Sequence, residues 1–131
     1  MNRLGSERGS AMVEVAFILP IVVLFIFGLI QFSTSTFNLN SAAYGSTQGA
    51  RYASVHGANS ASPCSAANVT AVVIASMPGV PAGSVTVTTT WNPNNTPGNT
   101  VTVAVSIKPW IKVIPTGSPA VGAKTQMTIL Q

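Results

Sequence analysis

The chain has 131 residues, of which 47% are hydrophobic and only 6% are charged. Globular domains usually carry about 25% charged residues, so the polar surface must come from Ser, Thr, Asn and Gln. The net charge of +4 comes from cations scattered along the chain, which argues against a nucleic-acid-binding patch. This length accommodates one small domain, with the composition of an exported or packed subunit.

The first predicted element is a membrane helix. An apolar run begins at Val15 and ends at Ile30 without a charged or strongly polar side chain, which gives about 24 Å of helix. Residues 11–32 would span the hydrocarbon core of about 30 Å. Within the run, Pro20 removes one backbone donor and predicts a bend, and Gly28 permits close helix packing.

Basic residues lie on one side of this run. Arg3 and Arg8 precede it, and the next basic residue is Arg51. By the positive-inside rule, the first residues stay in the cytoplasm and the remainder is exported.

A single carboxylate, Glu14, lies at the start of the apolar run. It would cost about 2.5–3.5 kcal/mol at the bilayer centre, but it falls at the cytoplasmic interface, where the cost is smaller. The simplest interpretation is an interfacial residue in the first helical turn, stabilised by the helix dipole.

The residues around Glu14 resemble the processing signal of type IV prepilins and pseudopilins. A short basic leader ends at Gly9, Ser10 follows, and the glutamate is the fifth residue after the glycine. The wider string RGSAMVEVAFILPIVVLFIFGLIQF is similar to TadE-like proteins of the tight-adherence (Tad/Flp) pilus system. The stretch AAYGSTQGARYASVHG resembles the family's continuing helix. The closing VTVAVSIKPWIKVIPTGSPAVGAKTQMTILQ resembles its final strands and proline-containing loop.

This resemblance implies a function in assembly. A membrane-embedded prepilin peptidase would cut between Gly9 and Ser10 on the cytoplasmic side, and Glu14 would be needed for processing or for assembly. The implied partners are this peptidase, other Tad pilins and pseudopilins, and the bacterial inner membrane, with no nucleic acid, small-molecule substrate or cofactor. Val15 departs from the family, which usually has an aromatic residue after the glutamate.

Cleavage would give Glu14 a chemical counterpart. The new α-amino group has a pKa near 8 in model peptides. In an assembling bundle, one subunit's carboxylate could meet a neighbour's amine, and pairing offsets much of the cost of burying two charges. Since a slip of one turn leaves both groups unpaired, the pair would also set the register.

The helix is expected to continue beyond the membrane to about residue 55. Small and apolar residues recur there in steps of three or four, as in a helix: Thr36, Leu39, Ala43, Thr47, Ala50 and Ser54. Gly45 and Gly49 are interpreted as a thin helix edge packed on a sheet.

The remaining sequence predicts one short helix and three strands. Residues 65–77 form the helix, with an apolar stripe of Val69, Val72, Val73 and Met77. Alternation predicts a strand with Val85, Val87, Thr89 and Trp91 on one face, and a second with Val101, Val103, Val105 and Ile107 inward. These two form an antiparallel hairpin. Residues 124–130 form a third strand, with Thr125, Met127 and Ile129 on one face. Trp110, between Lys108 and Lys112, is expected to cover the sheet edge.

The expected architecture is therefore α+β and pilin-like. A long N-terminal helix, whose lower half spans the membrane, packs on a small antiparallel sheet of about three strands, with one short extra helix. The predicted organisation is a cytoplasmic leader (1–9), the transmembrane and continuing helix (10–56), and an exported globular part (57–131).

Catalytic residues are sparse. His56 is the single histidine, expected to be solvated, and Cys64 is the single cysteine, expected to be a small, partly buried residue. The two could form a base and a nucleophile only with an orienting group and a pocket, and no metal-ligand cluster is present in sequence. We therefore do not expect an enzyme.

Two alternatives remain open. The chain could be a single-pass anchored exported protein without a role in a polymer. It could also be a secreted β-rich module behind a signal peptide cleaved near Ser33 and Ser35, although the apolar run exceeds the usual 7–15 residues of such a peptide.

Overall fold

The computed structural model of the protein describes residues 4–110 and 120–131, with side chains described from residue 9 onward. It contains one long helix, one short helix, a short 3₁₀ turn and three strands: α1 (Leu4–Val55), α2 (Ala66–Ala75), η1 (Ala82–Ser84), β1 (Val85–Asn92), β2 (Thr100–Ile107) and β3 (Val121–Thr128). The predicted α+β, pilin-like architecture is confirmed.

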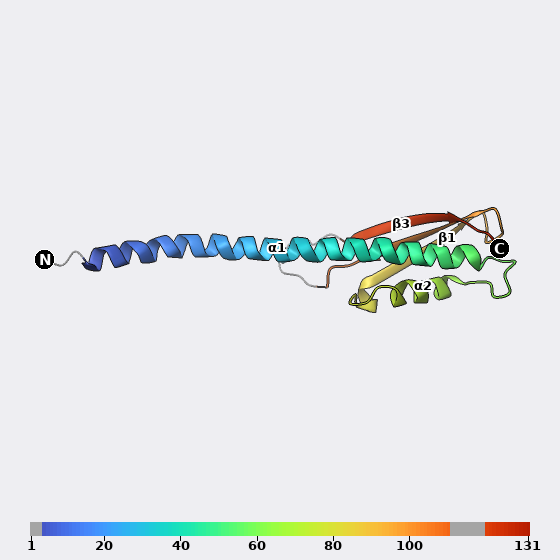
Figure 1. Ribbon diagram of the computed structural model, residues 1–131, viewed down its shortest axis with the longest axis horizontal. Coiled ribbons are helices and arrows are strands. Elements are labelled where there is room, and N and C mark those ends of the chain that lie inside the picture. Colours follow the sequence, from blue (N-terminus) through green and yellow to red (C-terminus); the bar gives the residue numbers. More distant parts are fainter. Residues whose placement is uncertain (1–3, 111–119) are drawn as a thin grey trace.

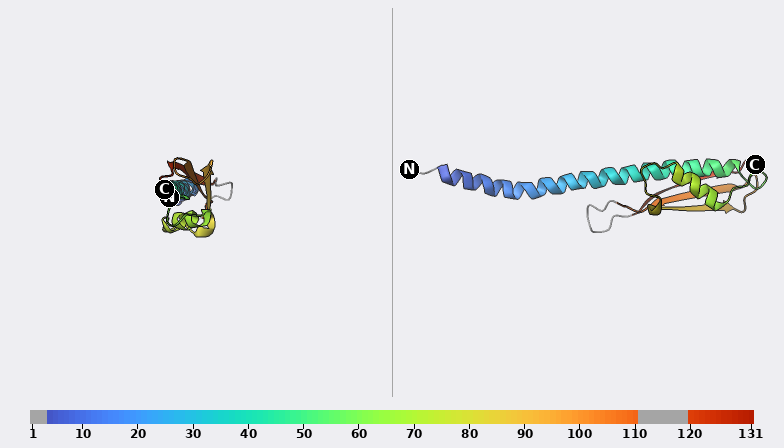
Figure 2. Two further views of the ribbon diagram at one scale, coloured as in Figure 1. Left: turned by 90° about the vertical axis from the view of Figure 1, so that its right-hand side faces the viewer. Right: turned by 90° about the horizontal axis from the view of Figure 1, so that it is seen from below.

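The molecule has the shape of a rod with a globular part at one end. The N-terminal half of α1 stands alone, whereas its C-terminal half lies along the sheet, with α2 beside it (Figure 1). Viewed along the rod, α1 and α2 lie on the same side of the sheet (Figure 2). The globular part is therefore a two-layer structure built around the end of α1.

Helix α1 runs without interruption through Pro20. The predicted bend is present only as a gentle curve of the apolar half (Figure 2). Where the sequence turns polar, Thr34 Oγ1 donates to the carbonyl oxygen of Ile30 at 2.9 Å, and Thr36 Oγ1 donates to that of Phe32 at 3.0 Å. These bonds satisfy the hydroxyl groups within the helix, so the polar segment continues α1 into the globular part.

The sheet is fully antiparallel in the order β1-β2-β3. Val85 pairs with Ile107 and Trp91 with Val101, so the predicted hairpin is confirmed. In the central strand β2 the alternating residues from Val101 to Ile107 are all buried. Period-two alternation fixes the register because a slip of one residue would expose this whole set.

The core lies between β2 and the two helices. Small residues on α1 let the helix approach closely: a Cβ on Gly45 would meet Met77 Sδ at 2.7 Å, and one on Gly49 would meet Val73 Cγ2 at 2.5 Å. The thin helix edge is therefore confirmed, although it packs against α2 as well as the sheet. The hydroxyl oxygens of Ser46 and Thr125 lie 2.8 Å apart and link α1 to β3.

The predicted continuation of the helix to residue 55 is confirmed, but the recurring small and apolar residues do not all face the core. Ala50 and Ser54 are buried and Thr47 is half-buried, but Thr36, Leu39 and Ala43 are exposed. The buried positions in this part of α1 are instead Asn38, Ala42, Gly45, Ser46, Gly49 and Ala53. A repeat of three or four residues indicates a helix but does not show which of its faces is buried. The small and polar residues here differ little in hydrophobicity, so they do not mark the buried face.

The other elements differ from expectation mainly at their ends. Helix α2 is shorter than predicted, and its N-cap Ser65 accepts from the backbone N–H of Asn68 at 3.3 Å. Strand β3 begins earlier and ends at Thr128, with Thr125 and Met127 on the inner face as predicted. The predicted proline-containing loop and Lys112 lie outside the described residues.

Candidate functional site

The N-terminal half of α1 is exposed along its described length. Residues 9–30 are all exposed, and from residue 9 onward Asn38 is the first buried residue of α1. The exposed side chains are large and apolar; Phe17, Leu24 and Phe32 each expose more than two thirds of their surface. Such a surface on all sides of a helix requires lipid or other helices to cover it.

Among the described residues, α1 is the one helix long and apolar enough to cross a membrane. Its most apolar 18-residue window has a mean hydropathy of 2.8, and none of that window is buried. A core helix of a soluble domain would also be apolar, but it would be buried inside the fold. The exposed window therefore favours a membrane segment over a core helix.

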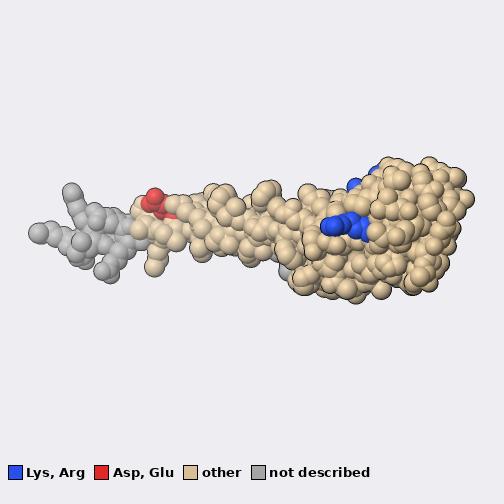
Figure 3. Space-filling model, turned by 45° about the vertical axis from the view of Figure 1, so that its right-hand side comes forward, with Lys and Arg blue, Asp and Glu red and all other residues tan. Residues whose placement is uncertain are grey.

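The N-terminal motif lies at the free end of this helix. Gly9, Ser10 and Glu14 are exposed, and the bond between Gly9 and Ser10 is part of the helical backbone. Ser10 and Glu14 are four residues apart, so they share one face of the helix. Figure 3 shows the carboxylate near the N-terminal end of the described residues, far from the cations of the globular part.

The other predicted residues of the segment are exposed within the part of the chain that the structure describes. Val15 and Ile30 are exposed by 59% and 45%, and Pro20 is exposed as well. A Cβ at Gly28 would have no heavy atom within 4 Å. The segment therefore presents a continuous lateral surface with a notch at Gly28, where another helix could approach closely.

His56 and Cys64 are brought near each other only through the backbone: the N–H of Cys64 donates to the carbonyl oxygen of His56 at 2.9 Å. His56 lies at the end of α1 as expected, but it is only partly solvated: the residue is half-buried and its ring stacks on Tyr52 with centroids 4.2 Å apart. Its Nδ1 lies 2.9 Å from the carbonyl oxygen of Tyr52. This arrangement caps the end of α1 with one imidazole.

Cys64 is 7% exposed and belongs to the core, so it is more deeply buried than the partly buried residue that was expected. Burial raises the pKa of its thiol, partly opposed by a backbone hydrogen bond. Within the described residues, no three His, Cys, Asp or Glu side chains cluster as metal ligands would.

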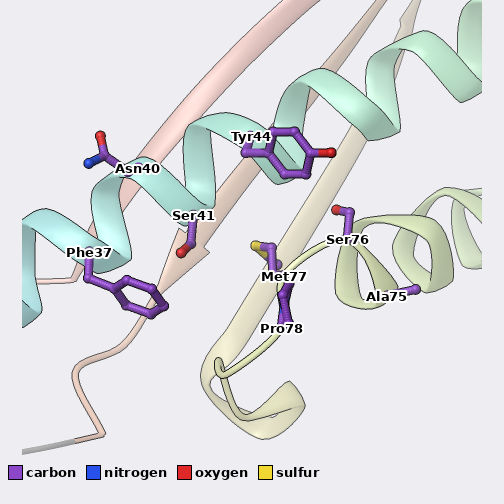
Figure 4. A pocket seen from close by; sticks show the side chains of 8 residues that line it. All are labelled: Phe37, Asn40, Ser41, Tyr44, Ala75, Ser76, Met77 and Pro78. Carbon is purple, nitrogen blue, oxygen red and sulfur yellow. The ribbon is translucent and has the colours of Figure 1, made fainter.

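Two shallow grooves flank the globular half of α1. The first has a volume of about 570 Å³ and lies between Phe37 and Tyr44 on α1 and Met77 and Pro78 beyond α2 (Figure 4). The second, of about 720 Å³, is lined by residues that include Arg51, Tyr52 and Met127. Both are open to solvent, so neither encloses a ligand.

The exposed aromatic residues Phe37 and Tyr44 were not singled out by sequence reasoning. They expose 47% and 56% of their surfaces in a stretch that otherwise consists mostly of small and polar residues. Phe37 comes soon after the apolar run, so the sequence did place it near the end of the membrane segment, whereas Tyr44 lies about two helical turns further along α1.

The comparisons with known proteins agree with the N-terminal motif. Residues 9–51, about a third of the chain, match the family model described as TadE-like protein. The resemblance to TadE-like proteins is thereby confirmed over the segment that contains Gly9, Glu14 and the whole apolar run. No curated protein and no solved structure matches the chain.

Proposed function

We propose that the chain is a minor pilin or pseudopilin that acts by assembly within a Tad/Flp-type pilus or secretion apparatus. The TadE-like segment associates the chain with Tad pilus systems. The proposed organisation is a leader of residues 1–9, an assembly helix of residues 10–56 and an exported globular part.

One observation carries this proposal: the bare apolar half of α1 continues into the globular part as a single unbroken helix. A simple tether needs only a hydrophobic segment and a flexible linker. A subunit that packs through its membrane helix gains from rigid continuity, because the helix packing then fixes the position of the globular part. The structure of α1 fits the second requirement.

Processing is proposed to occur between Gly9 and Ser10. Proteases generally need an extended substrate, and this bond is helical in the isolated subunit, so the peptidase must unwind the start of α1. Gly9 favours this step because glycine destabilises a helix interior by about 1 kcal/mol relative to alanine. With no side chain, Gly9 also lets the backbone approach the enzyme closely.

After cleavage, Glu14 would pair with the Ser10 amine of a neighbouring subunit. The two groups share a helix face and are separated along the axis by roughly 6 Å. Neighbours shifted by about one helical turn would therefore bring one carboxylate to the other subunit's amine. In hydrocarbon, pairing offsets much of the desolvation cost of both charges.

The proposed location is the bacterial inner membrane, with the N-terminus in the cytoplasm. This orientation rests on Arg3 and Arg8, whose side chains lie outside those described, and on the positive-inside rule. A removable signal peptide fits less well, because Ser33 and Ser35 lie inside α1 and cleavage there would cut the helix in two.

The chain offers a matched pair of variants for testing assembly, because Glu7 and Glu14 are its two acidic residues. We expect Glu14→Gln to abolish or strongly reduce recovery of the protein with other Tad pilins from native membranes. Glu7→Gln, a change within the leader, is expected to leave recovery unchanged. Equal recovery of both variants, with unchanged processing, would contradict the assigned role of Glu14.

A further inference from the structure

The end of the globular part that faces the apolar half of α1 carries exposed aromatic side chains from two distant parts of the chain. Phe37 is 47% exposed on α1, and Trp110 is 46% exposed beyond the end of β2. We propose that this end, called here the aromatic base and consisting of Phe37, Lys108 and Trp110, rests on the lipid headgroups of the adjacent leaflet.

The helix places Phe37 at the membrane surface. If Glu14 marks one edge of the hydrocarbon, a core of about 30 Å requires about 20 helical residues and ends near Thr34. A headgroup layer of about 5–7 Å adds four or five residues and ends near Asn38. Phe37 therefore falls within the headgroup layer, and Asn38 is already buried in the globular core.

Nothing in α1 loosens this geometry. No proline or glycine occurs between Gly28 and Gly45, and the hydroxyls of Thr34 and Thr36 are bonded within the helix. The globular part therefore begins at the membrane surface, with no spacer that could hold it away from the bilayer.

Contacts place Trp110 at the same end as Phe37. A Cβ at Gly79 would lie 3.8 Å from Phe37 Cζ, and the segment that follows Gly79 reaches Ser84. The carbonyl oxygen of Ser84 accepts from the backbone N–H of Lys108 at 2.9 Å, two residues before Trp110. Beyond β2 the chain continues toward the apolar half of α1 (Figure 1).

The chemistry of the aromatic base suits a lipid surface. Tryptophan is enriched where lipid meets water because its ring is apolar and its N–H can bond to headgroups. The exposed Lys108 can extend its ammonium group to a lipid phosphate while its stem lies along apolar surface. No acidic residue is present in the globular part to repel the phosphates, because Glu7 and Glu14 precede it.

This inference rests on the membrane anchoring in the proposed function but not on processing or polymer assembly. It assigns the globular part a second membrane contact besides the spanning helix. The contact would hold the unassembled subunit in one orientation on the bilayer, with the far ends of the strands directed into the aqueous phase.

The two tryptophans of the chain provide a direct test. Trp91 pairs with Val101, whereas the aromatic base follows Ile107, which pairs with Val85. Trp91 and the aromatic base are therefore separated along the strands by six residues, or roughly 20 Å. The full chain would be reconstituted into phosphatidylcholine–phosphatidylglycerol vesicles, with or without acyl chains brominated near the headgroup.

In Trp91→Phe, which retains Trp110, we expect the emission of Trp110 to be blue-shifted. Brominated vesicles should quench more than half of the Trp110 fluorescence that is seen in unbrominated vesicles. In Trp110→Phe, which retains Trp91, the brominated lipid is expected to have little effect. If Trp91→Phe fails to fold, the unmodified chain and Trp110→Phe can be compared instead. The difference in their quenching by brominated lipid then measures the quenching of Trp110.

Two results would overturn the proposal. If the protein floats with the vesicles but Trp110 emits as in water and is not quenched, the aromatic base does not contact lipid, while anchoring stands. If the protein does not float with the vesicles, membrane anchoring fails, and both the proposed function and this inference fail with it.

Discussion

Gly49 of α1 lies directly against Val73 of α2. A Cβ added to Gly49 would come within 2.5 Å of Val73 Cγ2, 3.2 Å of Val103 Cγ1 and 3.3 Å of Val69 Cγ1. The three valines belong to α2 and β2. This one position therefore limits how closely α1 can approach both α2 and β2.

We predict that Gly49→Ala destabilises the globular part. Alanine would stabilise the helix by about 1 kcal/mol, but overpacking a tight core costs about 1–3 kcal/mol. Valine side chains are restricted at χ1, so they cannot easily move aside. We expect a lower midpoint of unfolding in detergent. Unfolding would be monitored through the fluorescence of the half-buried Trp91.

Gly28→Ala is the matched control, because a Cβ there meets no atom within 4 Å. It should leave the unfolding midpoint of the globular part unchanged. Equal midpoints for both variants would show that α1 does not pack on α2 as closely as described.

A second prediction separates the two halves of the molecule. Ile107 is fully buried, whereas Ile21 is 69% exposed on the apolar half of α1. Ile107→Ala should reduce the free energy of unfolding by about 2–5 kcal/mol, while Ile21→Ala should leave it unchanged. Chemical denaturation of both variants in the same detergent measures the difference, and similar losses would contradict the independence of the bare segment.

A third prediction concerns the buried thiol of Cys64. Because burial raises its pKa, less reactive thiolate is present near neutral pH, and access is also restricted. Alkylation of the folded chain should be much slower than alkylation of the unfolded chain. A rate equal to that of the unfolded chain would show that Cys64 is accessible.

The raised pKa of Cys64 also affects the stability of the fold at alkaline pH. The unfolded thiol loses its proton at a lower pH than the folded one, so the unfolded state binds fewer protons in that interval. Stability should therefore be fully present below the unfolded pKa and fall as pH rises above it. Cys64→Ala should remove this part of the pH dependence when unfolding is followed across the alkaline range.

The sheet could be predicted from sequence because its signal is local and strong. Alternating valines from Val101 to Val105 mark the inner face of β2 directly, and the register of the hairpin follows from them. The phase of α1 could not be predicted in the same way. Its buried face consists of glycine, alanine, serine and one asparagine, and their burial depends on the positions of Val73 in α2 and Met77 in the turn beyond it.

The candidate sites divide similarly. Gly9, Ser10 and Glu14 lie within one short stretch of the chain, so the amino-acid sequence alone reveals this motif. The aromatic base joins Phe37 with Trp110, which are distant in sequence. Only the paired strands and the turn beyond α2 bring them to one end of the globular part.

The central claim is that α1 becomes an assembly helix once a leader is removed. The most direct measurement is the intact mass and N-terminal sequence of the protein extracted from its native membranes, in cells with an active prepilin peptidase. The account predicts a chain that begins at Ser10. A chain that still begins at Met1 would reduce the protein to a tethered domain, and loss of about 35 residues would indicate a signal peptide instead.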